Sequence, residues 1–426
     1  MASVLVNRVA KPATLKAAWR AIYKNGRSSK SDITQEEVEA FSSDAEKKLK
    51  NISNQLKNGT YKFQKAKGIR LTPEGKKEFR PIVIAKIEDR IVQRAVHDVL
   101  IKNPKIMKFV NNPHSFGGIR KKKKQKPEDE SLSAVPAAIQ AILSEIKKGS
   151  LFIIRSDISK FFTRIQKSEV TAIVKNAVQD EEFVDLFARA IKVELENMSQ
   201  LREDVNRFPI EDLGVAQGNC LSPLLGNLIL NDFDTKMNKG ECRCLRYIDD
   251  FIILAADQEY AEKKFQEAQS ILADLGMSLS IPKSRKAAIK TEKFDFLGIE
   301  FDNGFIRPSP EACGKILTSI AKALEESARA FLGYKSAKTF YEDLSLIKTI
   351  TKISGMLRGW GKHYYFCNDG KVFKRVDLEV DKKLRKYLGV YTSKKDQADD
   401  AGRRKLLGVT ILSEIGSTPF SWQWKP

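Results

Sequence analysis

The sequence predicts an α+β fold in which strands in the middle of the chain are flanked by helical segments. Residues 1 to about 60 place apolar side chains, among them Leu15, Trp19 and Ile22, at helical spacing. Short apolar runs bounded by turn residues, which are typical of strands, occur between residues 61 and 301. Residues 309 to about 390 are again helical in pattern and rich in basic side chains.

The composition indicates the kind of partner to expect. Lysine and arginine number 75 against 54 acidic residues, for a formal net charge of +21. Such an excess predicts a polyanionic partner, usually nucleic acid, although a merely soluble basic protein is the alternative. Five cysteines without a CxxC pair favour reduced thiols over a zinc site or a disulfide scaffold, and three histidines offer little for histidine-based catalysis. No apolar run approaches the ~18 residues of a membrane span, so we expect a cytoplasmic protein that has no membrane partner.

The N-terminal part predicts a helix followed by a hairpin. The helix should run from about Glu36 to Lys57, and the hairpin should lie between residues 61 and 85 with its turn near Gly75. Lys76 and Arg80 lie close to the turn. A basic finger of this kind can hold a triphosphate, and a solvated hairpin is the alternative.

A dense basic run lies between residues 113 and 126, after the hinge Gly117-Gly118. We expect it to contact a phosphate backbone. A solvated loop or a localisation-like tract is the alternative. The basic residues concerned are Arg120, Lys121, Lys122, Lys123 and Lys124.

Acidic residues follow two predicted strands. The apolar run 151–154 predicts a buried strand that ends in Asp157. Asp249 and Asp250 lie between two further apolar runs, which predicts a hairpin with carboxylates at its turn. Adjacent acids beside a core strand are costly unless a cation neutralises them, and Mg²⁺ prefers oxygen ligands. A surface turn and a capped strand end are the alternatives.

Three further segments carry candidate binding residues. Residues 214–230 combine a Gly-rich loop with a helix, for which Ser222 is the expected cap, and Gln217 could face a nucleotide. Residues 294–301 predict another hairpin. The segment around Arg358 and Trp360 interleaves basic and aromatic groups as nucleic-acid surfaces do, although core packing would also explain its aromatic residues.

Taken in order, these segments resemble the motifs of reverse transcriptases. The resemblance covers roughly residues 10–390, and seven matches in the same order make it specific. The matching residues are Arg80-Pro81-Ile82 with Asp89-Arg90-Ile91-Val92-Gln93 (motif 2), Ser115-Phe116-Gly117-Gly118-Ile119-Arg120 (motif 3), Asp157 with Phe161-Phe162, Gln217-Gly218 with Ser222-Pro223, Tyr247-Ile248-Asp249-Asp250, Lys283 and Phe296-Leu297-Gly298 (motifs A to E). Leu357-Arg358-Gly359-Trp360 through Tyr364-Tyr365 resembles the thumb, or domain X, of group II intron maturases.

The resemblance implies a right-hand polymerase with fingers, a palm built on a ferredoxin-like antiparallel sheet, and a helical thumb. The implied domains are residues 1–145 for an N-terminal extension and the fingers, 146–308 for the palm with interleaved fingers segments, 309–390 for the thumb and 391–426 for a C-terminal tail.

The resemblance also implies a site. Asp157, Asp249 and Asp250 would hold two Mg²⁺ ions, for which Mn²⁺ could substitute, and Lys283 would be a general acid toward pyrophosphate. The residues that would contact the incoming dNTP are Lys76, Arg80, Phe162 and Gln217, with Phe162 as the steric gate against a 2′-hydroxyl. The residues that would contact nucleic acid are Arg120 and Lys121 to Lys124, the primer-grip residues Phe296, Leu297 and Gly298, and Arg358 and Trp360.

Departures from the motifs narrow the resemblance. Ala216 stands where many relatives have proline, and Ser222-Pro223 argues against diversity-generating elements. We find no retron-like Asn-Ala-x-x-His segment, and nothing after the thumb segment resembles a zinc endonuclease module. The chain therefore resembles the "unknown group" of bacterial reverse transcriptases, in particular the type 2 defence-associated ones. That implies an RNA-directed DNA polymerase that copies a dedicated non-coding RNA into cDNA in antiphage defence.

Two other interpretations stay open. A group II intron maturase would be an RNA-binding splicing factor, and a template-independent or protein-primed nucleotide transferase would use the same palm. A purely structural nucleic-acid binder has no need for three acids at strand ends.

Overall fold

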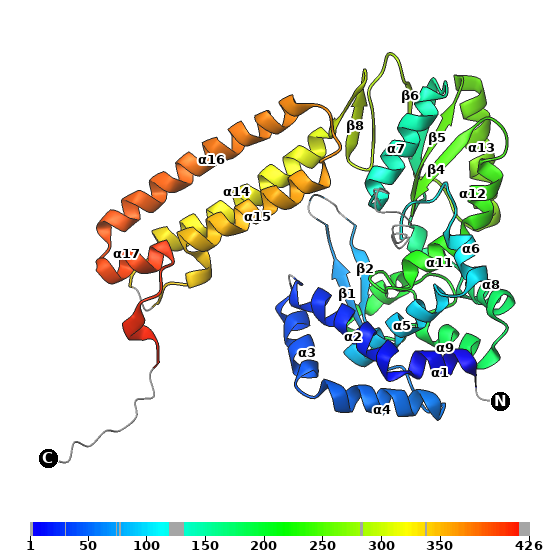
Figure 1. The fold of residues 1–426 in the computed structure, drawn as a ribbon, viewed down its shortest axis with the longest axis horizontal. Helices are drawn as coiled ribbons and strands as arrows, with labels where there is room; N and C mark the ends of the chain where they lie inside the picture. The colour runs from blue at the N-terminus through cyan, green and yellow to red at the C-terminus, as the bar shows by residue number, and fades with distance from the viewer. Residues whose placement is uncertain are drawn as a thin grey trace. The chain divides into compact units, whose positions relative to one another are not determined.

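The structure is a computed structural model that describes residues 3–29, 31–73, 75, 78–118, 132–281, 284–336 and 339–416. The chain divides into two compact units, residues 1–289 and 290–426, and each has its own apolar core (Figure 1). Across the described ranges, no helix is both long enough and apolar enough to cross a membrane.

Helices form the N-terminal part of the first unit. The helix expected from Glu36 to Lys57 is wrong in one respect: Asp44 leaves the helical region (φ −138°), so two helices replace one. Ser31 caps the first of these by accepting a hydrogen bond from the Thr34 amide (3.4 Å), as its position predicts. The helices are α1 (Val4–Ala10), α2 (Pro12–Arg27), α3 (Asp32–Ser42) and α4 (Ala45–Lys57).

The predicted basic hairpin is confirmed as a pair of antiparallel strands. Strands β1 (Lys67–Leu71) and β2 (Arg80–Ile84) pair with Leu71 opposite Arg80. The next helices are α5 (Ile87–Leu100), which packs on α2 and α9, and α6 (Pro104–Val110), which packs on α11 and α8.

The first unit contains a four-stranded antiparallel sheet, called the central sheet below, in the order β4-β5-β3-β6. Figure 1 shows its strands β4, β5 and β6 beside α7 and α13. The three predicted apolar runs are strands of this sheet, and Ile153, Ile154 and Ile253 are fully buried. Helix α7 packs on β4 and β5, and α13 packs on β3 and β5. The bounds are β3 (Phe152–Asp157), β4 (Arg243–Tyr247), β5 (Asp250–Ala255), β6 (Arg285–Ala288), α7 (Ala134–Lys147) and α13 (Gln258–Asp274).

The connection from β3 to β4 is mostly helical. Its last two helices, α11 and α12, bring apolar side chains such as Leu228 and Phe233 into the same core as the sheet. The elements are η1 (Phe161–Thr163), α8 (Lys167–Val178), α9 (Glu181–Ile191), α10 (Met198–Leu201), η2 (Arg202–Arg207), α11 (Ser222–Ile229) and α12 (Asn231–Met237).

The second unit combines a small sheet with a helical bundle. The hairpin predicted at residues 294–301 is confirmed, and β9 adds a third antiparallel strand to it. The predicted boundary between thumb and tail, at residues 390 and 391, lies within α16. The elements are β7 (Phe294–Phe296), β8 (Ile299–Asp302), β9 (Phe305–Pro308), α14 (Pro310–Leu332), η5 (Glu342–Leu344), α15 (Leu346–His363), α16 (Gly370–Gln397), α17 (Asp400–Leu407) and η6 (Leu412–Glu414).

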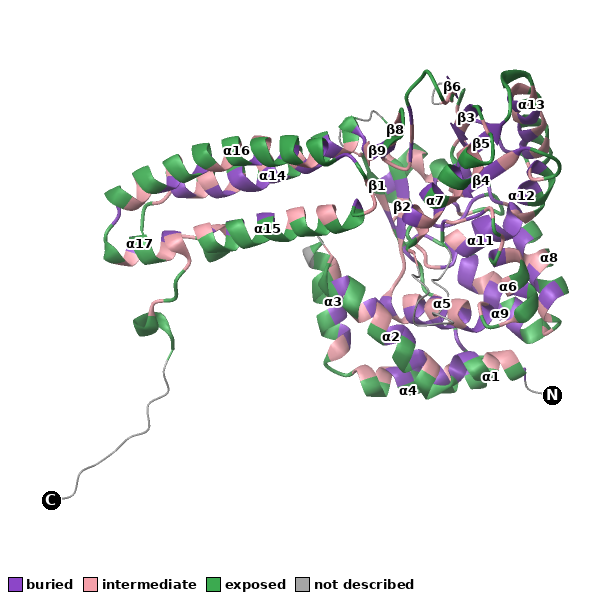
Figure 2. Ribbon diagram, turned by 45° about the horizontal axis from the view of Figure 1, so that its top comes forward, coloured by how far each residue is buried: buried purple, intermediate pink, exposed green. Residues whose placement is uncertain are grey.

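Burial differs between the sheet and the bundle. The strands of the central sheet are mostly buried, whereas α15 is mostly exposed or half-buried (Figure 2). Only Thr349 and Ile353 of α15 are fully buried. A largely exposed helix in so basic a chain leaves many side chains accessible to a partner.

Candidate active site

The turn between β4 and β5 carries two of the predicted acids. Tyr247 pairs with Asp250, so Ile248 and Asp249 form a two-residue loop. Ile248 has a φ of +60°, the sign that a type II′ turn requires at its first central residue, where glycine is usual. For a β-branched residue this conformation costs roughly 1–3 kcal/mol. The surroundings of the turn must therefore hold it in place.

The third predicted acid lies next to this turn. Strand β3 ends at Asp157, which pairs with Asp250 in the antiparallel register. The amide of Ile158 donates to the carbonyl of Asp249 (3.0 Å), which ties the end of β3 to the turn itself. Asp157 is buried, Asp249 half-buried and Asp250 exposed. The fold thus gathers three acids at one end of the sheet, although Asp157 precedes Asp249 and Asp250 by more than ninety residues in the sequence.

These acids have the chemistry of a site for a hard divalent cation. Cross-strand partners in an antiparallel pair share a face of the sheet, so Asp157 and Asp250 lie on one face. Carboxylate oxygens are the ligands that Mg²⁺ and Mn²⁺ prefer. Among the described residues, no three His, Cys, Asp or Glu side chains already converge on one point. The fit to a metal ion therefore rests on donor type and strand register.

The segment Ser115–Gly118 packs directly against the turn. Ser115 forms a parallel bridge with Arg246, and the amide of Phe116 donates to the Arg246 carbonyl (2.9 Å). A Cβ placed on Gly117 would lie 2.4 Å from Cγ1 of Ile248 and 2.8 Å from its backbone nitrogen, so only glycine fits there. The segment predicted as a hinge for phosphate contact is thus also a support for the acid-bearing turn.

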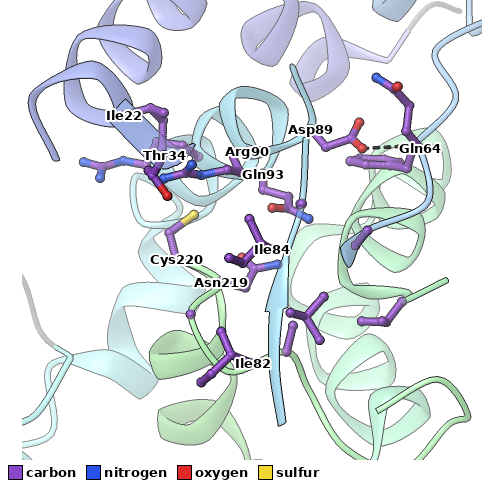
Figure 3. Close-up of a pocket in the computed structure, with 18 of the residues that line it drawn as sticks. Ile22, Thr34, Gln64, Ile82, Ile84, Asp89, Arg90, Gln93, Asn219 and Cys220 are labelled. Atoms are coloured by element: carbon purple, nitrogen blue, oxygen red, sulfur yellow. Dashed lines mark hydrogen bonds between the residues drawn. The ribbon is translucent and has the colours of Figure 1, made fainter. Parts of the chain in front are cut away.

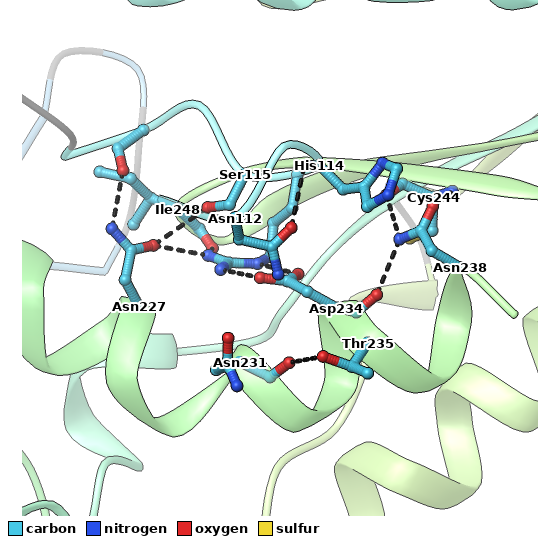
Figure 4. A network of polar contacts seen from close by, with 12 residues as sticks. Asn112, His114, Ser115, Asn227, Asn231, Asp234, Thr235, Asn238, Cys244 and Ile248 are labelled. Carbon is cyan, nitrogen blue, oxygen red and sulfur yellow. Dashed lines mark hydrogen bonds and ion pairs between the residues drawn. The ribbon is translucent and has the colours of Figure 1, made fainter. Parts of the chain in front are cut away.

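A buried polar network lies beneath the turn. Nε and Nη2 of Arg246 donate to the two carboxylate oxygens of Asp234 (2.7 and 2.5 Å), and Nη1 donates to the carbonyl of Ile248 (2.8 Å). Asn227 accepts from Arg246 and donates to the Gly117 carbonyl (3.2 and 2.9 Å). Figure 4 shows Asn227, Asp234 and Ile248 turned toward one another. Arg246, Asp234 and Asn227 were not predicted from the sequence, although a charged side chain within the apolar run of β4 was a signal for them.

Three residues predicted to contact the nucleotide lie on segments that are linked by backbone hydrogen bonds. Gln217 forms a parallel bridge with Ile82 of β2, the strand that begins at Arg80. The amide of Val215 donates to the carbonyl of Phe162 (2.8 Å). The loop that holds Gln217 therefore lies between the segments that carry Arg80 and Phe162. Arg80 is exposed, and Phe162 and Gln217 are half-buried.

Ser222 has a different role from the predicted one. Helix α11 begins at Ser222 itself, and its hydroxyl donates to the carbonyl of Ala216 (2.7 Å) instead of capping the helix. The residue thus closes the loop 216–222 on itself. Pro223 in the first turn lacks an amide hydrogen, so the helix start has one donor fewer to satisfy.

A cavity of about 310 Å³ lies between β2, α5 and the loop that follows Gln217. Figure 3 shows Arg90, Gln93 and Asn219 around it. Burial lowers the pKa of Arg90 and raises that of Asp89. Asp89 accepts hydrogen bonds from the Tyr61 hydroxyl and the Gln64 amide (2.7 and 2.8 Å), so this motif 2 acid anchors the local chain.

The predicted primer grip lies in the second unit. Phe296 pairs with Ile299, so Leu297 and Gly298 form the loop of the β7–β8 hairpin. Both have positive φ, +52° and +77°. Phe296 is buried, and the Gly298 carbonyl accepts from the Ser309 amide (2.8 Å).

The two predicted contacts on α15 differ in exposure. Arg358 is exposed, whereas Trp360 is half-buried. The Trp360 ring packs against Tyr364 and Phe373, with centroids 4.8 and 5.7 Å apart. Core packing, the alternative stated for these aromatics, therefore accounts for much of the Trp360 surface.

Several predicted site residues lie outside the described ranges. They are Lys76, Arg120, Lys121, Lys122, Lys123, Lys124 and Lys283.

A family model and several known proteins are similar to this chain. The family model of the reverse transcriptase (RNA-dependent DNA polymerase) matches residues 44–301. The group II intron-encoded protein LtrA of Lactococcus lactis subsp. cremoris is 25% identical over 226 residues, which are 53% of this chain and 33% of LtrA. Protein YkfC of Escherichia coli (strain K12) is 26% identical over 191 residues, 45% of each chain.

A solved structure of apo telomerase from Candida tropicalis covers 81% of this chain and 67% of its own, at 13% identity and a TM-score of 0.44. The alignments with LtrA and YkfC span less than half of those proteins. The family model matches well over half of the chain, and it includes the strands that carry all three acids. The chain belongs to the reverse transcriptase (RNA-dependent DNA polymerase) family.

Proposed function

We propose that the chain is an RNA-directed DNA polymerase whose metal-binding acids are Asp157, Asp249 and Asp250. The observation that carries the proposal is the pairing of Asp157 with Asp250 beside a turn that holds Asp249. Acids from separate strands at one site are what a two-metal phosphoryl transfer requires. The match to the reverse transcriptase family supports RNA as the template and DNA as the product.

The three acids bind and orient two Mg²⁺ ions. When bound, Mg²⁺ lowers the pKa of the primer 3′-hydroxyl and neutralises the charge of the triphosphate. The protein contributes position and charge: Arg80 and Lys76 contact the triphosphate, and Gln217 lies against the nucleotide and the template. Lys283 donates a proton to the leaving pyrophosphate. Catalysis by positioning and charge neutralisation suits a chain with many basic residues and only three histidines.

Phe162 selects the sugar. Its ring excludes a 2′-hydroxyl, so the enzyme prefers dNTPs to NTPs. The half-buried position of Phe162 and its backbone tie to Val215, two residues before Gln217, support this role.

The template–primer duplex is held by basic and backbone groups. Arg120 and Lys121 to Lys124 contact phosphates, the turn Phe296-Leu297-Gly298 grips the primer, and Arg358 and Trp360 contact the duplex from α15. The net charge of +21 supports a polyanionic partner.

In the finer form of the proposal, the template is one dedicated non-coding RNA, and its cDNA serves antiphage defence in bacteria. The support is the resemblance of the motifs, taken with their departures, to the "unknown group" of bacterial reverse transcriptases, and Ser222-Pro223 argues against diversity-generating elements. A group II intron maturase is the second candidate, and the similarity to the intron-encoded protein LtrA favours it.

The test is to purify the chain expressed from its native locus, sequence the RNA that co-purifies, and add Mg²⁺ with dNTPs. We expect DNA complementary to one bound RNA encoded at that locus. Bound intron RNA would support the maturase instead. DNA that matches no template would contradict RNA-directed synthesis and indicate a template-independent transferase.

A further inference from the structure

We propose that Arg246 is a positioning residue that fixes the acid-bearing turn in the geometry for metal binding. The inference rests on the proposed function, because it assigns Asp249 and Asp250 to the metal ions. It adds a residue that none of the motif matches includes.

The contacts of Arg246 connect the turn to two helices. Its guanidinium binds Asp234 of α12 through two hydrogen bonds, and a third group, Nη1, reaches both Asn227 of α11 and the carbonyl of Ile248. That carbonyl belongs to the one residue of the turn with a positive φ. Arg246 thus holds the turn at its strained point.

Asn227 extends the same network to the other side of the turn. Its Oδ1 accepts from the Ser115 hydroxyl (3.2 Å), and its Nδ2 donates to the Gly117 carbonyl. Gly117 in turn lies against Ile248. Arg246 and Gly117 therefore both contact the turn at Ile248, and the amide side chain of Asn227 hydrogen bonds to both of these residues.

The buried ion pair between Arg246 and Asp234 is a costly way to stabilise the fold. The side chains of Arg246 and Asp234 are 0% and 1% exposed. A buried ion pair pays a desolvation cost that apolar residues of similar volume avoid. A hydrogen bond from a charged donor is stronger than one between neutral groups, and a strained residue such as Ile248 persists only when its surroundings over-determine it. The network offsets that strain at the residue before the acids.

Lysine cannot reproduce these contacts, because an ammonium lacks the planar fork that binds Asp234 and Ile248 together. We therefore expect Arg246→Lys to fold but to let the turn relax. The matched control is Arg243→Lys. Arg243 lies on the same strand, and its guanidinium donates to the carbonyls of Gly240 and Cys242 (both 2.8 Å), away from the turn.

The experiment measures Mn²⁺ affinity by EPR of the free ion, together with kcat for primer extension on RNA, primer–template Kd and thermal unfolding. For Arg246→Lys we expect Mn²⁺ affinity to fall about tenfold, as for loss of a group that orients metal ligands. We expect kcat to fall roughly 10–100-fold, as for a displacement of about 1 Å. The Kd should stay within about twofold, and Arg243→Lys should match wild type in all four measurements.

A second variant keeps the inference testable if Arg246→Lys unfolds. Asn227→Asp retains the acceptor for Arg246 but loses the donation to Gly117, so it should lower Mn²⁺ affinity by a smaller factor. Wild-type Mn²⁺ affinity and kcat in the folded variants would overturn the inference alone. Absence of DNA synthesis by wild type would instead overturn the proposed function.

Discussion

Two hairpin turns of this chain share a length but differ in what holds them. The β4–β5 turn is Ile248-Asp249, with one positive φ at a β-branched residue. The β7–β8 turn is Leu297-Gly298, with positive φ at both positions, as in a type I′ turn. Glycine supplies half of the second turn without cost. The first has no glycine of its own and depends on Arg246, Asn227 and Gly117.

The difference shows how a functional site can depart from local preferences. A sequence suited to its turn needs little support, whereas a strained turn persists only when its surroundings over-determine it. The more strained turn here is the one beside two acids, because its positive φ falls on a β-branched residue. We infer that the position of the carboxylates, and not turn stability, determines the residues at 247–250.

The largest effect should follow removal of the acids. Replacing Asp249→Ala together with Asp250→Ala should lower DNA synthesis roughly a thousandfold or more, because the metal ligands are lost. RNA binding should stay nearly unchanged, since positively charged surfaces carry it. Primer extension and filter binding measure the two quantities. Asp232→Asn, an exposed acid on α12 paired with Lys236, is the control. Wild-type synthesis in the double variant would exclude these acids from catalysis.

A smaller loss should follow a change beside the turn. In Gly117→Ala the added Cβ would meet the backbone of Ile248, so the turn must shift. We expect kcat to fall about 10–100-fold. Gly389→Ala is the control, because a Cβ there meets nothing within 4 Å in helix α16. If both variants extend primers at the wild-type rate, the turn tolerates movement and the comparison between the two hairpins fails.

A change at Phe162 should alter the preference for dNTPs over NTPs while all three acids stay in place. Phe162→Ala should lower the preference for dNTPs over NTPs by roughly tenfold or more, since removal of an aromatic ring opens space for a 2′-hydroxyl. Phe162→Tyr keeps the ring and should keep the preference. Single-nucleotide kcat/KM values for both substrates measure it. An unchanged ratio in Phe162→Ala would remove this residue from the role.

The smallest effect should be a change in the thermal stability of the protein after a substitution in the β7–β8 turn. Leu297→Asn places a residue that tolerates positive φ at the strained position, which favours the fold by about 1 kcal/mol. Thermal unfolding should shift upward by roughly 2 °C. An equal shift from Leu297→Ala, which tolerates positive φ no better than leucine, would show that φ is not the cause.

The sequence predicted the strands and acids of the site but not what supports them. The run 151–154 and the runs around Asp249 identify strands because burial on both faces leaves continuous apolar stretches. Asp234, Asn227 and the contact of Gly117 with Ile248 were not predicted, because they depend on contacts between residues up to about 130 positions apart along the chain. No local pattern encodes such contacts.

Local rules also failed at two helix ends. Serine is a typical N-cap residue, yet the hydroxyl of Ser222 donates to the Ala216 carbonyl and closes the preceding loop. The pattern from Glu36 to Lys57 stays amphipathic through a break at Asp44, because both helices bury apolar residues such as Phe41 and Leu49 in one core. Periodicity identifies a buried face, and backbone interruptions within it go undetected.

The most direct test of the account is DNA synthesis by the purified wild-type chain on a primed RNA template with dNTPs and Mg²⁺. We predict DNA that extends the primer, is complementary to the RNA, and disappears when Mg²⁺ is chelated and returns when Mn²⁺ is added. No extension on any primed RNA, or extension that ignores the template sequence, would contradict the assignment of Asp157, Asp249 and Asp250 to an RNA-directed DNA polymerase.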